Sequence, residues 1–100
     1  MAHLLTAKCY DKHGTLIAKA SNSYTQTHPI QAHFAKLCGK PDLIYLHAEI
    51  AALLKCGKRK PYSIFVERFK KDGSPGLAKP CAICERAIKA WGVKYVTYTT

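Results

Sequence analysis

The residues best suited to chemistry lie in two short segments, His-Ala-Glu and Pro-Cys-Ala-Ile-Cys. They supply one imidazole (His47), one carboxylate (Glu49) and two thiols (Cys81 and Cys84). Imidazole nitrogen and thiolate sulfur are zinc ligands, and a catalytic zinc site has three protein ligands and one open position. Glu49 is then free to transfer protons. The two segments together predict a catalytic zinc centre, although each segment alone is a weak signal.

These side chains can meet only if the two segments lie at the starts of helices. On a continuous helix, residues two apart point about 200° away from each other. His47 and Glu49 can therefore serve one site only if His47 lies where its helix begins. Cys81 and Cys84 are three residues apart and share a face on the first turn of a helix that opens at Pro80. Both helix N-termini would favour thiolate at the site.

The rest of the sequence predicts the elements that position these two helices. Asp and Gly in a four-residue connection indicate a hairpin near the start, and a glycine follows each expected helix. The last strand-helix-strand unit predicts a parallel pair with a right-handed crossover. The fold class is therefore α/β, with a mixed sheet of about four strands. The expected strands are residues 4–10, 15–21, 62–69 and 93–98, and the expected helices are residues 29–38, 47–56 and 80–91.

The composition indicates one small folded domain spanning residues 1–100. A hydrophobic share of 48% excludes disorder of the whole chain. Sixteen Lys and Arg against six Asp and Glu give a net charge of +10, which favours a phosphate-bearing partner, although it also serves solubility. We expect no membrane partner and a cytoplasmic location, because there is neither a run of about 20 apolar residues nor a secretion signal. Five cysteines fit reduced thiols better than a disulfide framework.

The pattern H-x-E followed by P-C-x-x-C resembles the zinc-dependent cytidine and deoxycytidylate deaminase superfamily. The resemblance covers essentially the whole chain, because the expected order of elements is also similar. It implies a three-layer α-β-α cytidine deaminase-like fold and a Zn²⁺ cofactor held by His47, Cys81 and Cys84. It further implies hydrolysis of a cytosine base to uracil and ammonia, with Glu49 moving protons from water to the ring nitrogen and the departing amine.

The resemblance also implies substrate contacts. Asn22 would contact the sugar or the base, and the small Ala48 would let the base approach the backbone. From the residues alone, Asn22 could instead be a turn or cap residue, and His28 could be a solvated helix-entry residue. A run of charges is more often a solvated face. Further sugar or phosphate contacts are expected at Ser21, Ser23, Tyr24, Thr27 and His28. Candidate phosphate or strand contacts in the basic segments are Arg68, Lys70, Lys71 and Lys79.

The substrate is less well determined than the reaction. Compact chains of this kind look similar to deoxycytidylate deaminases of bacterial viruses, so conversion of dCMP in the host cytoplasm is our first expectation. The net charge favours an alternative, a cytosine deaminase acting on single-stranded DNA or RNA, and purine rings also fit the motif. The chain ends sixteen residues after Cys84, so we expect an open pocket and a homo-oligomer.

Two alternatives belong to other classes of protein. A non-catalytic, zinc-stabilised module that binds nucleic acid would use the same ligands, but Glu49 argues against it. A thiol oxidoreductase using Cys81 and Cys84 would form a reversible disulfide and bind no metal. Metal content and the effect of replacing Glu49 distinguish these alternatives from the deaminase.

Overall fold

The computed structural model describes residues 5–23, 25–70 and 72–100. The number, type and order of the elements agree with the sequence prediction, and the predicted ranges run one to three residues beyond most of them. The elements are β1 (Leu5–Tyr10), β2 (Leu16–Ser21), α1 (Pro29–Leu37), α2 (Ala48–Lys55), β3 (Ser63–Arg68), α3 (Ala82–Ala90) and β4 (Tyr95–Tyr98). Within the described residues, no helix is long and apolar enough to span a bilayer.

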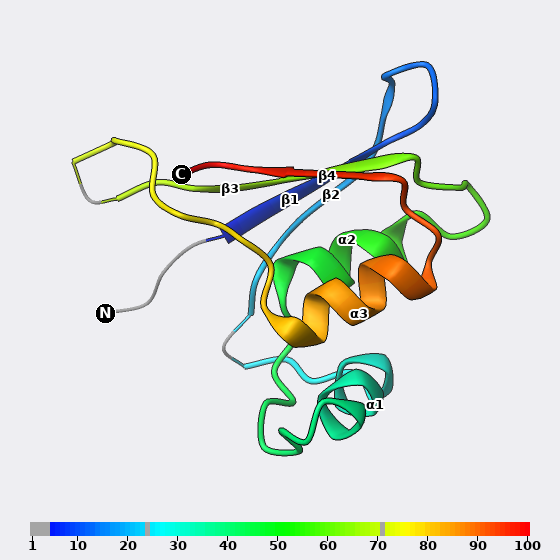
Figure 1. Cartoon of the computed structure of the whole chain (residues 1–100), viewed down its shortest axis with the longest axis vertical. Coiled ribbons are helices and arrows are strands. Elements are labelled where there is room, and N and C mark those ends of the chain that lie inside the picture. Colours follow the sequence, from blue (N-terminus) through cyan, green and yellow to red (C-terminus); the bar gives the residue numbers. More distant parts are fainter. Residues whose placement is uncertain (1–4, 24, 71) are drawn as a thin grey trace.

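The four strands form one mixed sheet in the order β2-β1-β3-β4 (Figure 1). β1 and β2 are the predicted antiparallel hairpin, and β3 and β4 are the predicted parallel pair. An antiparallel pairing of β1 with β3 joins these two halves. Ala7 and Cys9 of β1 point into the core beside Ile64 and Val66 of β3, as the two-residue period of strands requires.

All three helices lie on one side of the sheet (Figure 1). α2 contacts β1, β2 and β3, and α3 packs beside α2. α1 packs on α3 instead of the sheet, with the Phe34 ring centroid 6.3 Å from that of Trp91. The layers are therefore sheet, then α2 with α3, then α1, which corrects the predicted α-β-α order. The opposite face of the sheet carries polar groups, including an ion pair between Lys8 Nζ and Glu67 Oε1 at 2.8 Å.

Candidate metal centre

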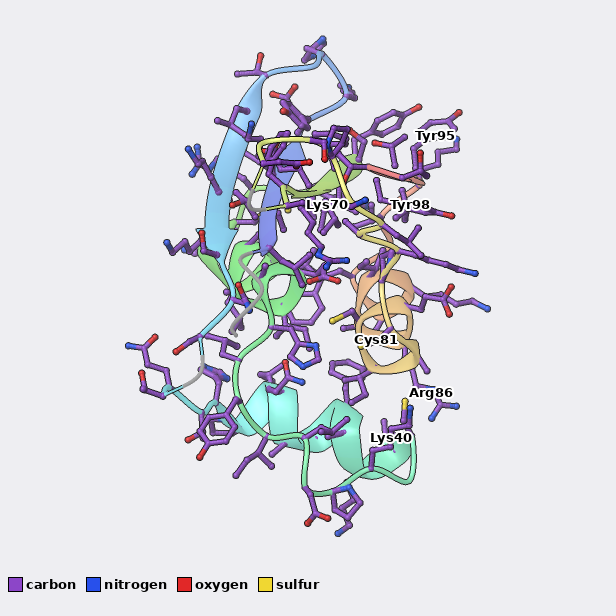
Figure 2. All side chains as sticks on the ribbon, turned by 90° about the vertical axis from the view of Figure 1, so that its left-hand side faces the viewer. Lys40, Lys70, Cys81, Arg86, Tyr95 and Tyr98 are labelled. Atoms are coloured by element: carbon purple, nitrogen blue, oxygen red, sulfur yellow. The ribbon has the colours of Figure 1, made fainter. Side chains whose placement is uncertain are left out.

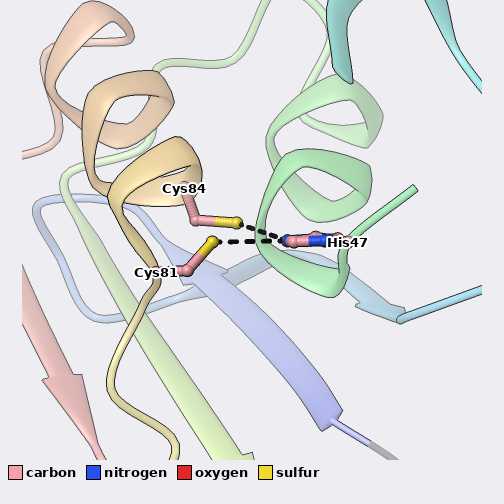
Figure 3. A group of neighbouring side chains, drawn as sticks. All are labelled: His47, Cys81 and Cys84. Atoms are coloured by element: carbon pink, nitrogen blue, oxygen red, sulfur yellow. Dashed lines mark hydrogen bonds between the residues drawn. The ribbon is translucent and has the colours of Figure 1, made fainter. Parts of the chain in front are cut away.

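His47 and Cys81 each occupy the N-cap position of a helix. The backbone of His47 is extended (φ −78°, ψ 154°) just before α2, and the backbone of Cys81 is extended just before α3. Neither side chain caps its own helix, and the two point toward each other across the gap between the helices (Figure 3). His47 therefore lies at the start of α2, which is the position that its two-residue spacing from Glu49 required.

Three ligand atoms meet at this point. His47 Nδ1 lies 3.2 Å from Cys84 Sγ and 3.5 Å from Cys81 Sγ, and all three atoms are within 4.8 Å of one another (Figure 3). In a tetrahedral zinc site, a sulfur and a nitrogen ligand are separated by about 3.5 Å. The observed cluster fits such an ion with little rearrangement, and its donor set is of the kind that zinc prefers.

Hydrogen bonds within the cluster favour a thiolate on Cys81. The Cys84 thiol donates to Cys81, and this bond, assisted by His47, lowers the pKa of Cys81 to about 3. The same bond, together with burial, raises the pKa of Cys84. The hydrogen bond with Cys81 also raises the pKa of His47. Thiolate is the form that binds metal, so the cluster favours the metal-binding form of Cys81.

Glu49 lies on the first turn of α2 and is only 4% exposed. Its Oε1 is buried and has no hydrogen-bond partner in the part of the chain that the structure describes. Burial raises the pKa of this carboxyl group. A buried polar atom without a partner lowers the stability of the fold by about 1–3 kcal/mol. The position of such an atom beside three candidate metal-ligand atoms therefore points to a ligand or water there. The arrangement can hold a cation and a proton carrier side by side.

Gln31 is a site residue that the sequence analysis did not identify. It is fully buried on α1, where its Oε1 accepts a hydrogen bond from the His47 backbone N–H at 3.1 Å. Its Nε2 donates to the carbonyl of Leu43 at 3.3 Å. A signal was present in the sequence, because Gln31 is three and four residues from the buried Phe34 and Ala35 and so shares their helix face. Gln31 positions the backbone of the imidazole ligand.

We expect the substitution Gln31→Leu to lower zinc affinity by about 10- to 100-fold, the usual effect of removing a group that orients a metal ligand. The leucine keeps most of the side-chain volume but leaves the His47 N–H without its acceptor. Competition for zinc with a chromophoric chelator measures the change. Gln26→Leu, at an exposed position, is the matched control. Equal affinity of the two variants would show that Gln31 does not position the ligand.

A cavity of about 340 Å³ adjoins the cluster and includes His47 in its wall. Asn22 and Ser23 also line it, together with Tyr45. Asn22 has a structural role as well, because its Oδ1 accepts the backbone N–H of Leu5 at 2.9 Å. The structure thus brings two of the predicted substrate contacts to the imidazole ligand.

Other predicted contacts lie elsewhere. Ser21 and His28 line a separate cavity of about 300 Å³ that does not include His47. His28 caps α1, with its Nδ1 accepting the N–H of Ile30 at 3.1 Å, as its alternative interpretation required. Thr27 forms a β-bridge with Tyr45. The side chain of Ala48 is completely buried. Tyr24 lies outside the described residues.

The predicted phosphate contacts differ in their surroundings. Lys70 and Lys79 are exposed on the segment that leads from β3 to α3. Arg68 is half-buried, and its Nη1 donates to the carbonyl of Leu77 at 3.4 Å, so it supports that segment. Lys71 lies outside the described residues.

Comparison of the chain with protein-family models gives no match, and comparison with curated protein sequences gives none either. The centre is therefore interpreted from its own geometry, as a His-Cys-Cys cluster that is able to hold a metal ion.

Proposed function

We propose that this protein is a zinc-dependent hydrolytic deaminase that converts a cytosine base to uracil, with dCMP as the first substrate to consider. The observation that carries the proposal is the convergence of His47, Cys81 and Cys84 next to the buried carboxyl group of Glu49. A structural zinc site uses four protein ligands and needs no free carboxylate. A dithiol redox pair has no need of the third donor, His47. Three donors and one carboxyl group therefore favour hydrolysis.

Zinc held by these residues would lower the pKa of water to about 7 and so provide a nucleophile at neutral pH. Glu49 would accept the proton that this water loses and deliver it to the ring nitrogen and the departing amine. The water oxygen would first add to the amino-bearing carbon, and the carbon–nitrogen bond would then break, so that water and cytosine give uracil and ammonia. The raised pKa of Glu49 suits this role, because a proton carrier must hold its proton between two transfers.

A second candidate substrate is cytosine within single-stranded DNA or RNA. Cys81 is exposed, and Figure 2 shows it on the same side of the molecule as Lys40, Arg86 and Tyr98. Strand-binding proteins combine cations that follow the phosphates with aromatic rings that stack on bases. Cations and a tyrosine on the same side of the molecule as Cys81 favour this alternative over a purely structural zinc module.

The experiment that tests the proposal gives the zinc-loaded protein dCMP and a cytosine-containing single-stranded oligonucleotide in one mixture. Uracil formation is followed separately in the two substrates. Reaction of dCMP alone supports the first proposal, and reaction of the oligonucleotide supports the second. If the protein binds zinc and neither substrate reacts, the cytosine assignment is wrong, and adenine- and guanine-bearing substrates come next.

A further inference from the structure

A separate cavity of about 520 Å³ lies at the far ends of α2 and α3 from the metal centre. Its walls come from the β1–β2 turn, the segment after α2 and the segment after α3, which meet on the right of Figure 1. The metal ligands lie at the N-termini of the same two helices. Helices of 8 and 9 residues are about 12–14 Å long, so the cavity is distinct from the candidate active site.

The cavity is lined by cations. Lys12, Lys60 and Lys94 contribute to its walls, and in the described part of the chain none of the three forms an ion pair. Among the described residues that line the cavity, the one acid is Asp11, whose Oδ1 accepts the backbone N–H groups of His13 at 2.8 Å and Thr15 at 3.0 Å. These hydrogen bonds lower the pKa of Asp11. The three lysines and Asp11 therefore give the lining two net positive charges.

The ends of the two helices do not cancel this charge. Each helix C-terminus carries a partial charge of about −0.5, so the pair contributes about −1 against the two positive charges of the lining. Lys55 and Lys89 lie in the last turns of α2 and α3 and offset the helix dipoles further. The field in the cavity therefore attracts an anion.

One wall offers an aromatic surface. Tyr62 lines the cavity, and its ring centroid lies 5.4 Å from that of Tyr95. Lys94 Nζ lies over the Tyr62 ring, 6.0 Å from its centroid. An aromatic surface beside a cation matches a ligand that combines a planar ring with a phosphate. We propose that this cavity binds a nucleotide unit, either free or within a single strand, separately from the metal centre.

The test measures binding of nucleotides that lack cytosine, so that the deaminase substrate is absent. The probes are a fluorescein-labelled 12-nucleotide oligothymidylate, free thymidine monophosphate and inorganic phosphate. We expect the double variant Lys60→Ala/Lys94→Ala to bind the first two probes about tenfold or more weakly. The control Lys19→Ala/Lys36→Ala removes the same charge at exposed positions outside the cavity and is expected to stay within about twofold of the wild type.

A second variant separates ring stacking from charge. Tyr62→Leu is expected to weaken binding of thymidine monophosphate and oligothymidylate about tenfold and to leave inorganic phosphate unchanged. If oligothymidylate binds more tightly than thymidine monophosphate, the ligand is a strand. If the two bind equally, the ligand is a free nucleotide. Equal losses in the two double variants would overturn the proposal, because net charge alone would then explain binding. Zinc content and dCMP turnover of the same variants show whether the metal centre is affected, so the two proposals fail independently.

Discussion

Replacing Glu49 with glutamine is expected to lower the rate of uracil formation by about 10²- to 10⁴-fold, the contribution that general acid–base catalysis makes. The amide has nearly the shape of the carboxyl group and fits the same buried position on α2. It cannot accept a proton from water and return it to the substrate. Turnover of dCMP by the zinc-loaded protein measures the effect, and zinc content is determined on the same sample.

The chain offers a matched control for this experiment. Glu85 is likewise an acidic residue in the first turn of a helix, but it is exposed on α3 and outside the cluster. Glu85→Gln should keep the wild-type rate. We also expect Glu49→Gln to retain its zinc and its unfolding midpoint, because the amide keeps the shape of the side chain and keeps an oxygen that can accept the hydrogen bond from Cys84. An unchanged rate in Glu49→Gln would remove Glu49 from the mechanism, and loss of zinc would make it a structural residue.

Local signals explain why the order of elements was predictable. Gly39, Gly57 and Gly92 follow the three helices, and each has a positive φ, a conformation in which other residues are strained. The Asp and Gly residues of the first connection indicated the hairpin in the same local way. The position of α1 was not predictable, because it depends on which surface covers its apolar face. Phe34 packs against Trp91 of α3, and no local pattern specifies that partner.

The cluster of His47, Cys81 and Cys84 was predictable because the types and the spacing of these residues restrict the chemistry. The substrate contacts were less so, since successive residues of an extended chain point to opposite sides. Ser21 and Asn22 accordingly line different cavities, although they are neighbours in the sequence. Gln31 was overlooked because its function lies in a hydrogen bond to a backbone group of a residue sixteen positions later. Such contacts are defined only once α1 and α2 are placed.

Zinc is expected to stabilise the wild-type protein and to have no such effect on Cys84→Ala. An ion that binds only the folded state adds about 4 kcal/mol to the free energy of unfolding when its concentration is 1,000 times its Kd. Removing the buried thiol leaves two donors, too few for a tightly held ion. Urea denaturation with added zinc and with a chelator measures the difference. Because Cys84→Ala also empties buried space, the zinc-dependent change within each variant is compared, and absolute stability is not.

Cys38→Ala is the control, since Cys38 lies outside the cluster and should respond to zinc as the wild type does. The same titration separates the deaminase from the thiol oxidoreductase. A redox pair would make stability depend on reductant through a Cys81–Cys84 disulfide and would leave it independent of zinc. In a metal centre the ion holds the thiolates that would otherwise be oxidised. Stability then depends on zinc and is independent of reductant. A zinc response that persists in Cys84→Ala would place the metal elsewhere in the protein and remove the foundation of the proposed activity.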